Sequence, residues 1–129
     1  DFVNEWVKEN IKDDMTDLYK SVKESDVLVF ATPIYWWNMS AQMKIFIDRL
    51  FGLQDVKDFE GKKAVLLMTY GGELPNSGPE IVQKSIKEIC DYLKIDLVQI
   101  YGTCTDGYVP VAENKKAQGE VYKMGKELE

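Results

Sequence analysis

Two uninterrupted apolar runs constrain the fold of this chain more than any other feature of its sequence. Residues 27–31 (Val-Leu-Val-Phe-Ala) and 64–68 (Ala-Val-Leu-Leu-Met) contain no polar side chain. A strand with one solvated face alternates apolar and polar residues, whereas a strand buried on both faces does not. The two runs therefore predict parallel strands that are buried on both faces. A third segment, residues 95–101, carries Asp96 and Gln99 among its aliphatic residues, which indicates an edge strand.

Four further segments place apolar residues at the spacing of a helix. Ser40 is expected to cap the second of these helices, and Ser77 with Glu80 has the spacing of a capping box at the start of the third. The apolar stripes are Ile11, Met15, Leu18 and Val22; Met43, Phe46, Ile47 and Leu50; Val82, Ile86, Ile89 and Leu93; and Ala117, Val121, Met124 and Leu128. Helices that alternate with strands in this way predict one α/β domain with an open parallel sheet and right-handed crossovers.

In such sheets, ligands bind beyond the carboxyl ends of the strands. The first loop there, residues 32–39, is expected to begin where Pro33 ends the strand, and it crowds Tyr35, Trp36 and Trp37 together. This cluster is equally typical of a hydrophobic plug or dimer contact and of a wall that stacks on a flat ring. The second loop begins with Tyr70 and two glycines, which suit a tight turn or the other side of a ring-binding slot.

Composition excludes several other functions. The 22 acidic and 16 basic residues give a net charge of −6, which disfavours nucleic acid as a partner. No window approaches ~20 continuous apolar residues, so no membrane span is expected. The chain has no histidine, and its two cysteines, Cys90 and Cys104, lie on different predicted elements. We therefore expect no metal site, no histidine-dependent catalysis and a reduced, cytoplasmic protein, in which a cofactor would have to supply any reactivity.

Two longer motifs point to a family. The pattern P-x-Y-x-x-N-M-S-A-Q-M-K begins at Pro33 and is followed by F-I-D-R from Phe46. Together with the apolar strand at residues 26–32, these motifs resemble the NAD(P)H-dependent FMN reductases, which are flavodoxin-like proteins related to multimeric quinone reductases and iron–sulfur flavoproteins. The resemblance implies that the three strands correspond to strands 3, 4 and 5 of the flavodoxin-like order 2-1-3-4-5, packed with four helices.

The resemblance also implies a function and a site. FMN would be the cofactor and NAD(P)H the electron donor, the acceptor would be a quinone, a flavin or another small molecule, and the protein would be a homo-oligomer. No side chain would be catalytic, because the flavin carries the chemistry. The residues implied to contact the flavin ring are Thr32, Pro33, Ile34, Tyr35, Trp36, Trp37, Asn38, Tyr70, Gly71, Gly72 and Glu73.

The chain departs from the family pattern at its N-terminal side. The first strand, the loop that binds the FMN phosphate, the first helix and the second strand have no counterpart in it, and residues 1–10 lack the cysteines of the iron–sulfur branch. We therefore expect residues 1–129 to be a single, N-terminally incomplete flavodoxin-like domain that binds FMN poorly and leaves residues 27–31 at a sheet edge. The chain would be a fragment, a truncated form completed by a partner chain, or a flavin-free module.

Two alternatives to the reductase stay open. A flavodoxin-type electron carrier would use the same ring site, and its acidic surface would suit a basic partner. A flavin-free interaction module would instead assemble through the aromatic loop and the exposed edge strand.

Overall fold

The computed structural model describes residues 13–50, 52–53, 56–105 and 109–128, which form an open, mostly parallel α/β sheet. Its strands lie in the order β2-β1-β3-β4. β1 (Val27–Tyr35), β3 (Lys63–Tyr70) and β4 (Asp96–Cys104) are parallel, and the short β2 (Asn38–Met39) is antiparallel to β1. The predicted parallel α/β arrangement is thus confirmed, with one additional antiparallel strand.

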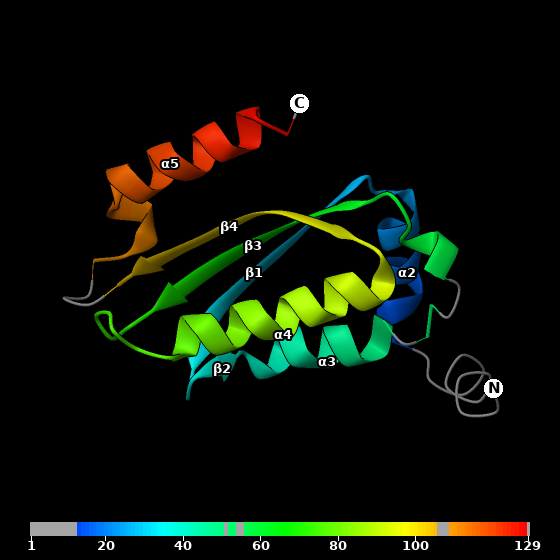
Figure 1. Ribbon diagram of the computed structural model, residues 1–129, viewed down its shortest axis with the longest axis horizontal. Helices are drawn as coiled ribbons and strands as arrows, with labels where there is room; N and C mark the ends of the chain where they lie inside the picture. Colours follow the sequence, from blue (N-terminus) through cyan, green and yellow to red (C-terminus); the bar gives the residue numbers. More distant parts are fainter. Residues whose placement is uncertain (1–12, 51, 54–55, 106–108, 129) are drawn as a thin grey trace.

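Four helices accompany the sheet in the described chain. These are α2 (Met15–Glu24), α3 (Ala41–Leu50), α4 (Gly78–Leu93) and α5 (Lys115–Lys126), together with single 3-10 turns at Val56–Asp58 and Val111–Glu113. Figure 1 shows α3 and α4 side by side on one face of the sheet and α5 on the other. Each of the four predicted helices is present; Ile11, Gly107 and the rest of residues 1–12 and 106–108 lie outside the described residues.

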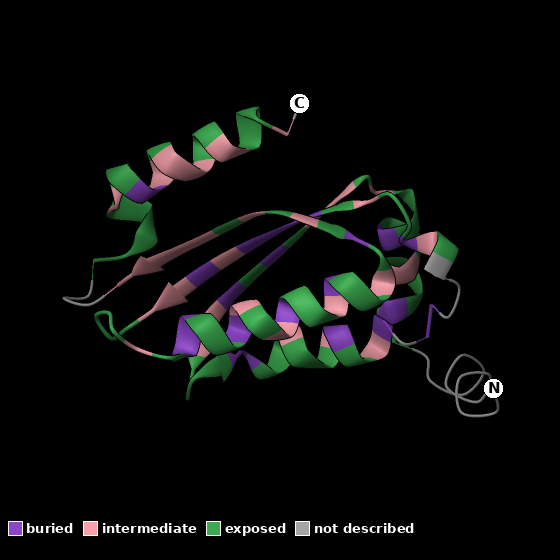
Figure 2. Cartoon of the chain, in the orientation of Figure 1, coloured by how far each residue is buried: buried purple, intermediate pink, exposed green. Residues whose placement is uncertain are grey.

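The main core lies between the sheet and the pair α3 and α4. The apolar stripes predicted for these helices supply it, and the purple residues of Figure 2 concentrate at this contact. Its most buried members include Phe30, Leu66, Met68, Val82, Ile86 and Cys90. The residues of β1 and β3 that point to this side are therefore buried as the sequence predicts.

The opposite face of β1 does not follow the prediction. Val29 is 56% exposed and Ala31 is also exposed, so burial of both faces is wrong for this strand within the described structure. The reason is the placement of α5, which packs mainly over β4. A cavity of about 600 Å³ lies between α5 and the sheet, and apolar side chains such as Leu67, Val121 and Tyr122 line it.

The sheet edges agree with the prediction at β4 and along most of β1, whose end is covered by the unpredicted strand β2. β4 pairs only with β3 among the described strands, and it extends to Cys104 rather than ending at Tyr101. From Val27 to Pro33, β1 likewise has β3 as its single described partner. Pro33 does not end β1: it lies inside the strand opposite Thr69. A proline is tolerated there because an edge strand does not need every backbone N–H for a ladder.

Candidate functional site: an aromatic hairpin facing a glycine loop

The aromatic segment forms a β-hairpin, whereas the sequence predicts a loop. Ile34 pairs with Met39 and Tyr35 with Asn38, which leaves Trp36 and Trp37 as a two-residue turn. Both tryptophans have positive φ, 48° and 62°. A two-residue hairpin turn requires this geometry and normally uses Asn or Gly, since a bulky residue there costs about 1–2 kcal/mol. The turn is therefore built from residues that its backbone disfavours.

The aromatic side chains of the hairpin are exposed. The exposed fractions are 62% for Tyr35, 89% for Trp36 and 53% for Trp37, and the two indole rings lie 5.8 Å apart between centroids. A hydrophobic plug packed within the chain would bury these rings, so that interpretation is wrong for the described structure. A contact with another molecule, whether a flat ring or a second protein, stays compatible with the exposure.

A second segment of the candidate site follows β3 in the chain. The glycine loop, residues 71–76, leaves the end of β3 and leads into α4. Asn76 holds it: its side-chain Nδ2 donates to the carbonyl of Gly72 at 2.9 Å, and its Oδ1 accepts from the backbone N–H of Gly78 at 2.9 Å. The predicted capping box is therefore wrong, because Ser77 makes no side-chain cap and Asn76 accepts at the start of the helix instead.

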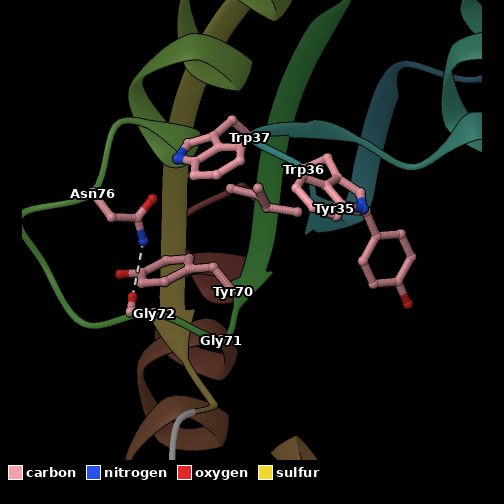
Figure 3. Close-up of a pocket in the computed structure, with 8 residues that line it drawn as sticks. Tyr35, Trp36, Trp37, Tyr70, Gly71, Gly72 and Asn76 are labelled. Atoms are coloured by element: carbon pink, nitrogen blue, oxygen red, sulfur yellow. Dashed lines mark hydrogen bonds between the residues drawn. The ribbon is translucent and has the colours of Figure 1, made fainter.

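Between the hairpin and the glycine loop lies a pocket of about 480 Å³, a volume within the range of small-molecule sites. Figure 3 shows Trp37 and Tyr70 on opposite sides of this space, while the ring of Tyr35 is directed away from Tyr70. A Cβ atom placed on Gly71 would meet nothing within 4 Å, so the absence of a side chain leaves the backbone open at this point. The lining residues are Ile34, Tyr35, Trp36, Trp37, Tyr70, Gly71, Gly72 and Asn76.

The other implied site residues lie elsewhere. Thr32 and Pro33 line the cavity beneath α5, and the side chain of Asn38 accepts from the N–H of Met39 within the hairpin at 2.8 Å. Glu73 is exposed and is not among the residues that line the pocket. Asn76, in contrast, lines the pocket although it belongs to none of the motifs that predict the site. The signal in the sequence is an Asn two residues before Gly78, the spacing at which an Asn side chain accepts from a backbone N–H in a turn.

The pocket offers shape and hydrogen bonds rather than reactive side chains. No Lys, Arg, Asp or Glu is among its lining residues, and no cluster of three metal-ligating side chains occurs in the described part of the chain. Cys90 of α4 is fully buried in the core, and burial raises the pKa of its thiol to about 11, so it is a poor nucleophile. None of the helices in the described ranges is long and apolar enough to cross a membrane.

The comparison with known proteins identifies the family. Residues 1–100 match the family described as NADPH-dependent FMN reductase, and the chain belongs to that family. An iron–sulfur flavoprotein of Methanosarcina thermophila is 33% identical over 92 residues, which are 71% of this chain and 46% of the relative. The human ribosyldihydronicotinamide dehydrogenase [quinone] is 32% identical over 76 residues, or 52% of this chain and 33% of that enzyme.

A third relative is a putative NAD(P)H-dependent FMN-containing oxidoreductase of Bacillus subtilis, 31% identical over 81 residues (57% of this chain and 45% of the relative). The chain thus spans less than half the length of each of these three relatives.

Solved structures agree on the fold. General stress protein 14 of Treponema denticola, solved in complex with FMN, superposes with a TM-score of 0.63 at 18% identity, over 95% of this chain and 72% of that one. The Trp repressor binding protein of Bacillus subtilis gives a TM-score of 0.66 at 24% identity, over 73% of this chain and 61% of that one. The sheet and helices described here therefore have the arrangement of flavodoxin-like proteins.

Proposed function

We propose that this chain forms the flavin-ring-binding part of an FMN-dependent NAD(P)H oxidoreductase. The observation that carries the proposal is the pocket between Trp37 and Tyr70, which is bordered by a backbone that has no side chains at Gly71 and Gly72. Aromatic faces stack on planar heterocycles, and nearby backbone groups hydrogen-bond the edge of a ring. When bound, FMN accepts a hydride from NAD(P)H and delivers the electrons to a quinone, a flavin or another small acceptor.

The residues of the chain have distinct roles in this proposal. Trp37 and Tyr70 hold the ring between them, and Trp36, the most exposed of the three hairpin aromatics, borders the opening through which nicotinamide and acceptor would alternate. The glycine loop offers its backbone N–H groups to the negative charge that a reduced flavin carries, a form of stabilisation that costs little reorganisation. The relatives whose names include NAD(P)H, FMN or a quinone support the same class of reaction.

The phosphate of FMN has no counterpart in the pocket. No cationic side chain is among the described residues that line it, and the chain as a whole carries a charge of −6. We therefore expect the ring alone to provide the affinity. Lumiflavin, which lacks the ribityl phosphate, should then bind about as tightly as FMN.

Flavin fluorescence tests this proposal directly. Lumiflavin, riboflavin and FMN are titrated with the protein, and stacking on Trp37 and Tyr70 should quench all three with similar dissociation constants. Trp37→Ala should weaken the quenching of each flavin by about tenfold, the loss expected for a stacked aromatic. Absence of lumiflavin quenching at saturating protein would refute the ring site, and a submicromolar dissociation constant for FMN alone would show that a phosphate site exists.

Reduction of the bound flavin by NADH or NADPH distinguishes a reductase from a flavodoxin-type electron carrier. Bleaching of the bound flavin by NADH or NADPH under anaerobic conditions is expected of a reductase, and a flavodoxin-type carrier would stay oxidised. Addition of a quinone should then restore the colour.

A second function is favoured by two exposed features. Trp36 is 89% exposed, and β1 leaves Val29 on an open face and has one described strand partner along most of its length. We propose that these features make the protein a homo-oligomer, and a flavin-free interaction module would use the same surfaces. Light scattering over a range of protein concentrations measures the assembly, and Trp36→Ala should shift it toward the monomer if the hairpin takes part.

A further inference from the structure

Asn76 joins two segments that border the pocket. One end of its amide group accepts a hydrogen bond from Gly78 at the start of α4, and the other end donates to the carbonyl of Gly72 in the glycine loop, each at 2.9 Å. The two bonds use opposite properties of one side chain, an acceptor and a donor. Figure 3 shows the dashed bond from Asn76 toward Gly72 at the side of the pocket below Trp37.

The start of α4 is itself packed against the aromatic hairpin. A Cβ atom on Gly78 would lie 2.9 Å from Cγ2 of Ile34 and 3.5 Å from Cα of Trp37, so only glycine allows this approach without a shift. The helix start therefore lies close to the backbone of Trp37. The two hydrogen bonds of Asn76 join the glycine loop to this helix start. Through the helix start, they also link the glycine loop to the hairpin.

We infer that Asn76 is a positioning residue of the pocket, which sets the separation between the glycine loop and the aromatic hairpin for a flat ring. The inference rests on the proposed function, since the ring is the ligand whose thickness the separation would match. Asn76 acts through Gly72: the bond to the Gly72 carbonyl orients the peptide groups of the loop before the ligand arrives. Such preorganisation raises affinity because less ordering is needed on binding.

The chemistry of the amide provides a selective test. Asn76→Asp keeps an oxygen that accepts from Gly78, and a carboxylate near a helix N-terminus is favourable, so the helix start is retained. The ionised carboxylate has no hydrogen to give to the Gly72 carbonyl. When the carboxyl group is protonated, its O–H replaces the lost donor. The variant thus breaks one of the two bonds at neutral pH and restores it in acid.

Lumiflavin affinity is the main measurement, made on the full chain by fluorescence quenching. We expect Asn76→Asp to bind lumiflavin about tenfold more weakly than the wild type at pH 7, with an unchanged melting temperature. As the pH falls below about 4, where an ordinary aspartate gains its proton, the affinity of the variant should rise toward that of the wild type. The neighbouring ionisable residues Tyr70, Glu73 and Glu80 are present in both proteins, and the wild-type curve accounts for them.

Asn114→Asp is the matched control. Asn114 accepts from the N–H of Ala117 at 3.0 Å at the start of α5, and it is not among the residues that line the pocket. The same chemical change there should leave lumiflavin affinity and its pH dependence as in the wild type. An equal loss in both variants would overturn the inference, as would a loss in Asn76→Asp that does not recover in acid.

A measurement without ligand separates this inference from the proposed function. Amide hydrogen exchange of residues 71–73 should be faster in Asn76→Asp than in the wild type at pH 7, with exchange in β3 and α4 unchanged. If the wild type fails to bind lumiflavin, the proposed function fails, whereas the exchange data still test whether Asn76 orders the loop. Unchanged exchange in the variant would overturn the positioning role.

Discussion

The side-chain hydroxyl of Thr32 accepts a hydrogen bond from the backbone N–H of Ser40 at 3.0 Å. The same hydroxyl donates to the carbonyl of Pro33 at 2.8 Å, and both Thr32 and Ser40 are buried. Ser40 in turn caps α3, because its Oγ accepts from the N–H of Met43 at 3.3 Å, as the sequence predicts. Thr32 thus connects β1 to the start of α3 across the base of the aromatic hairpin.

Thr32→Val should destabilise the protein without changing the ring site. The valine has nearly the same shape but leaves the buried N–H of Ser40 without its acceptor, which costs about 1–3 kcal/mol. Urea denaturation measures the loss, and lumiflavin titration should give the wild-type affinity. Thr32→Ser, which keeps the hydroxyl, is the control. If the Thr32→Val protein is fully folded and still loses much of its flavin affinity, Thr32 contacts the flavin.

The turn of the aromatic hairpin should show a conflict between stability and binding. Replacing Trp36 with Asn and Trp37 with Gly supplies residues that tolerate positive φ, so we expect stability to rise by roughly 1 kcal/mol. Lumiflavin affinity should fall by at least about tenfold because the aromatic wall is removed. The control is Tyr92→Ala, which removes an exposed aromatic of α4 that does not line the pocket. Retained affinity in the double variant would contradict stacking on the hairpin.

Two glycines should respond in opposite directions to the same substitution. Gly78→Ala places a methyl group 2.9 Å from Cγ2 of Ile34, and the resulting overpacking should cost about 1–3 kcal/mol. Gly119 lies inside α5 with nothing within 4 Å of the position of a Cβ, so Gly119→Ala should stabilise the helix by up to about 1 kcal/mol. Thermal unfolding compares both variants with the wild type. Equal effects would mean that the close contact of α4 with the hairpin is absent.

The ion pair between Asp13 and Arg49 should make stability depend on acid pH. The hydrogen bond from Arg49 is the largest cause that lowers the pKa of the Asp13 carboxyl below its ordinary value of 3.8. A lowered pKa in the folded state means that the contribution is present above pH 3.8 and is lost as the pH falls through the folded-state value. Asp13→Asn should therefore be slightly less stable than the wild type at pH 7 and equally stable well below pH 3.8.

Urea denaturation at a series of pH values measures this difference. The asparagine still accepts from the backbone N–H of Met15, so the start of α2 is preserved and the variant isolates the ion pair. Added salt should reduce the difference at pH 7, because both side chains are partly exposed. A difference that persists below the pKa would indicate a packing effect.

The helices and parallel strands follow from short-range patterns. The stripes of α3 and α4 predict their core residues because helical spacing alone decides which side chains share a face. The apolar runs at residues 27–31 and 64–68 predict the strand centres for a similar reason, and the polar residues of β4 indicate its edge position. Each of these features depends on residues that are neighbours along the chain.

The hairpin and the two hydrogen bonds of the Asn76 side chain do not follow from such patterns. Two tryptophans have no local preference for positive φ, and β2 exists only because Asn38 and Met39 pair back onto the end of β1. Asn76 looks like an ordinary loop residue until Gly72 and Gly78 are brought to its two ends. The exposure of Val29 similarly depends on where α5 packs, which its own sequence does not specify.

Local periodicity and contiguous motifs are enough to predict the family, the α/β class and the two segments that border the pocket. The hairpin, the pocket that Trp37 and Tyr70 line, and the hydrogen bonds of Thr32 and Asn76 appear only in the folded chain. These features are contacts between residues far apart in the chain, whose energies exist only after the sheet has brought the strand ends together.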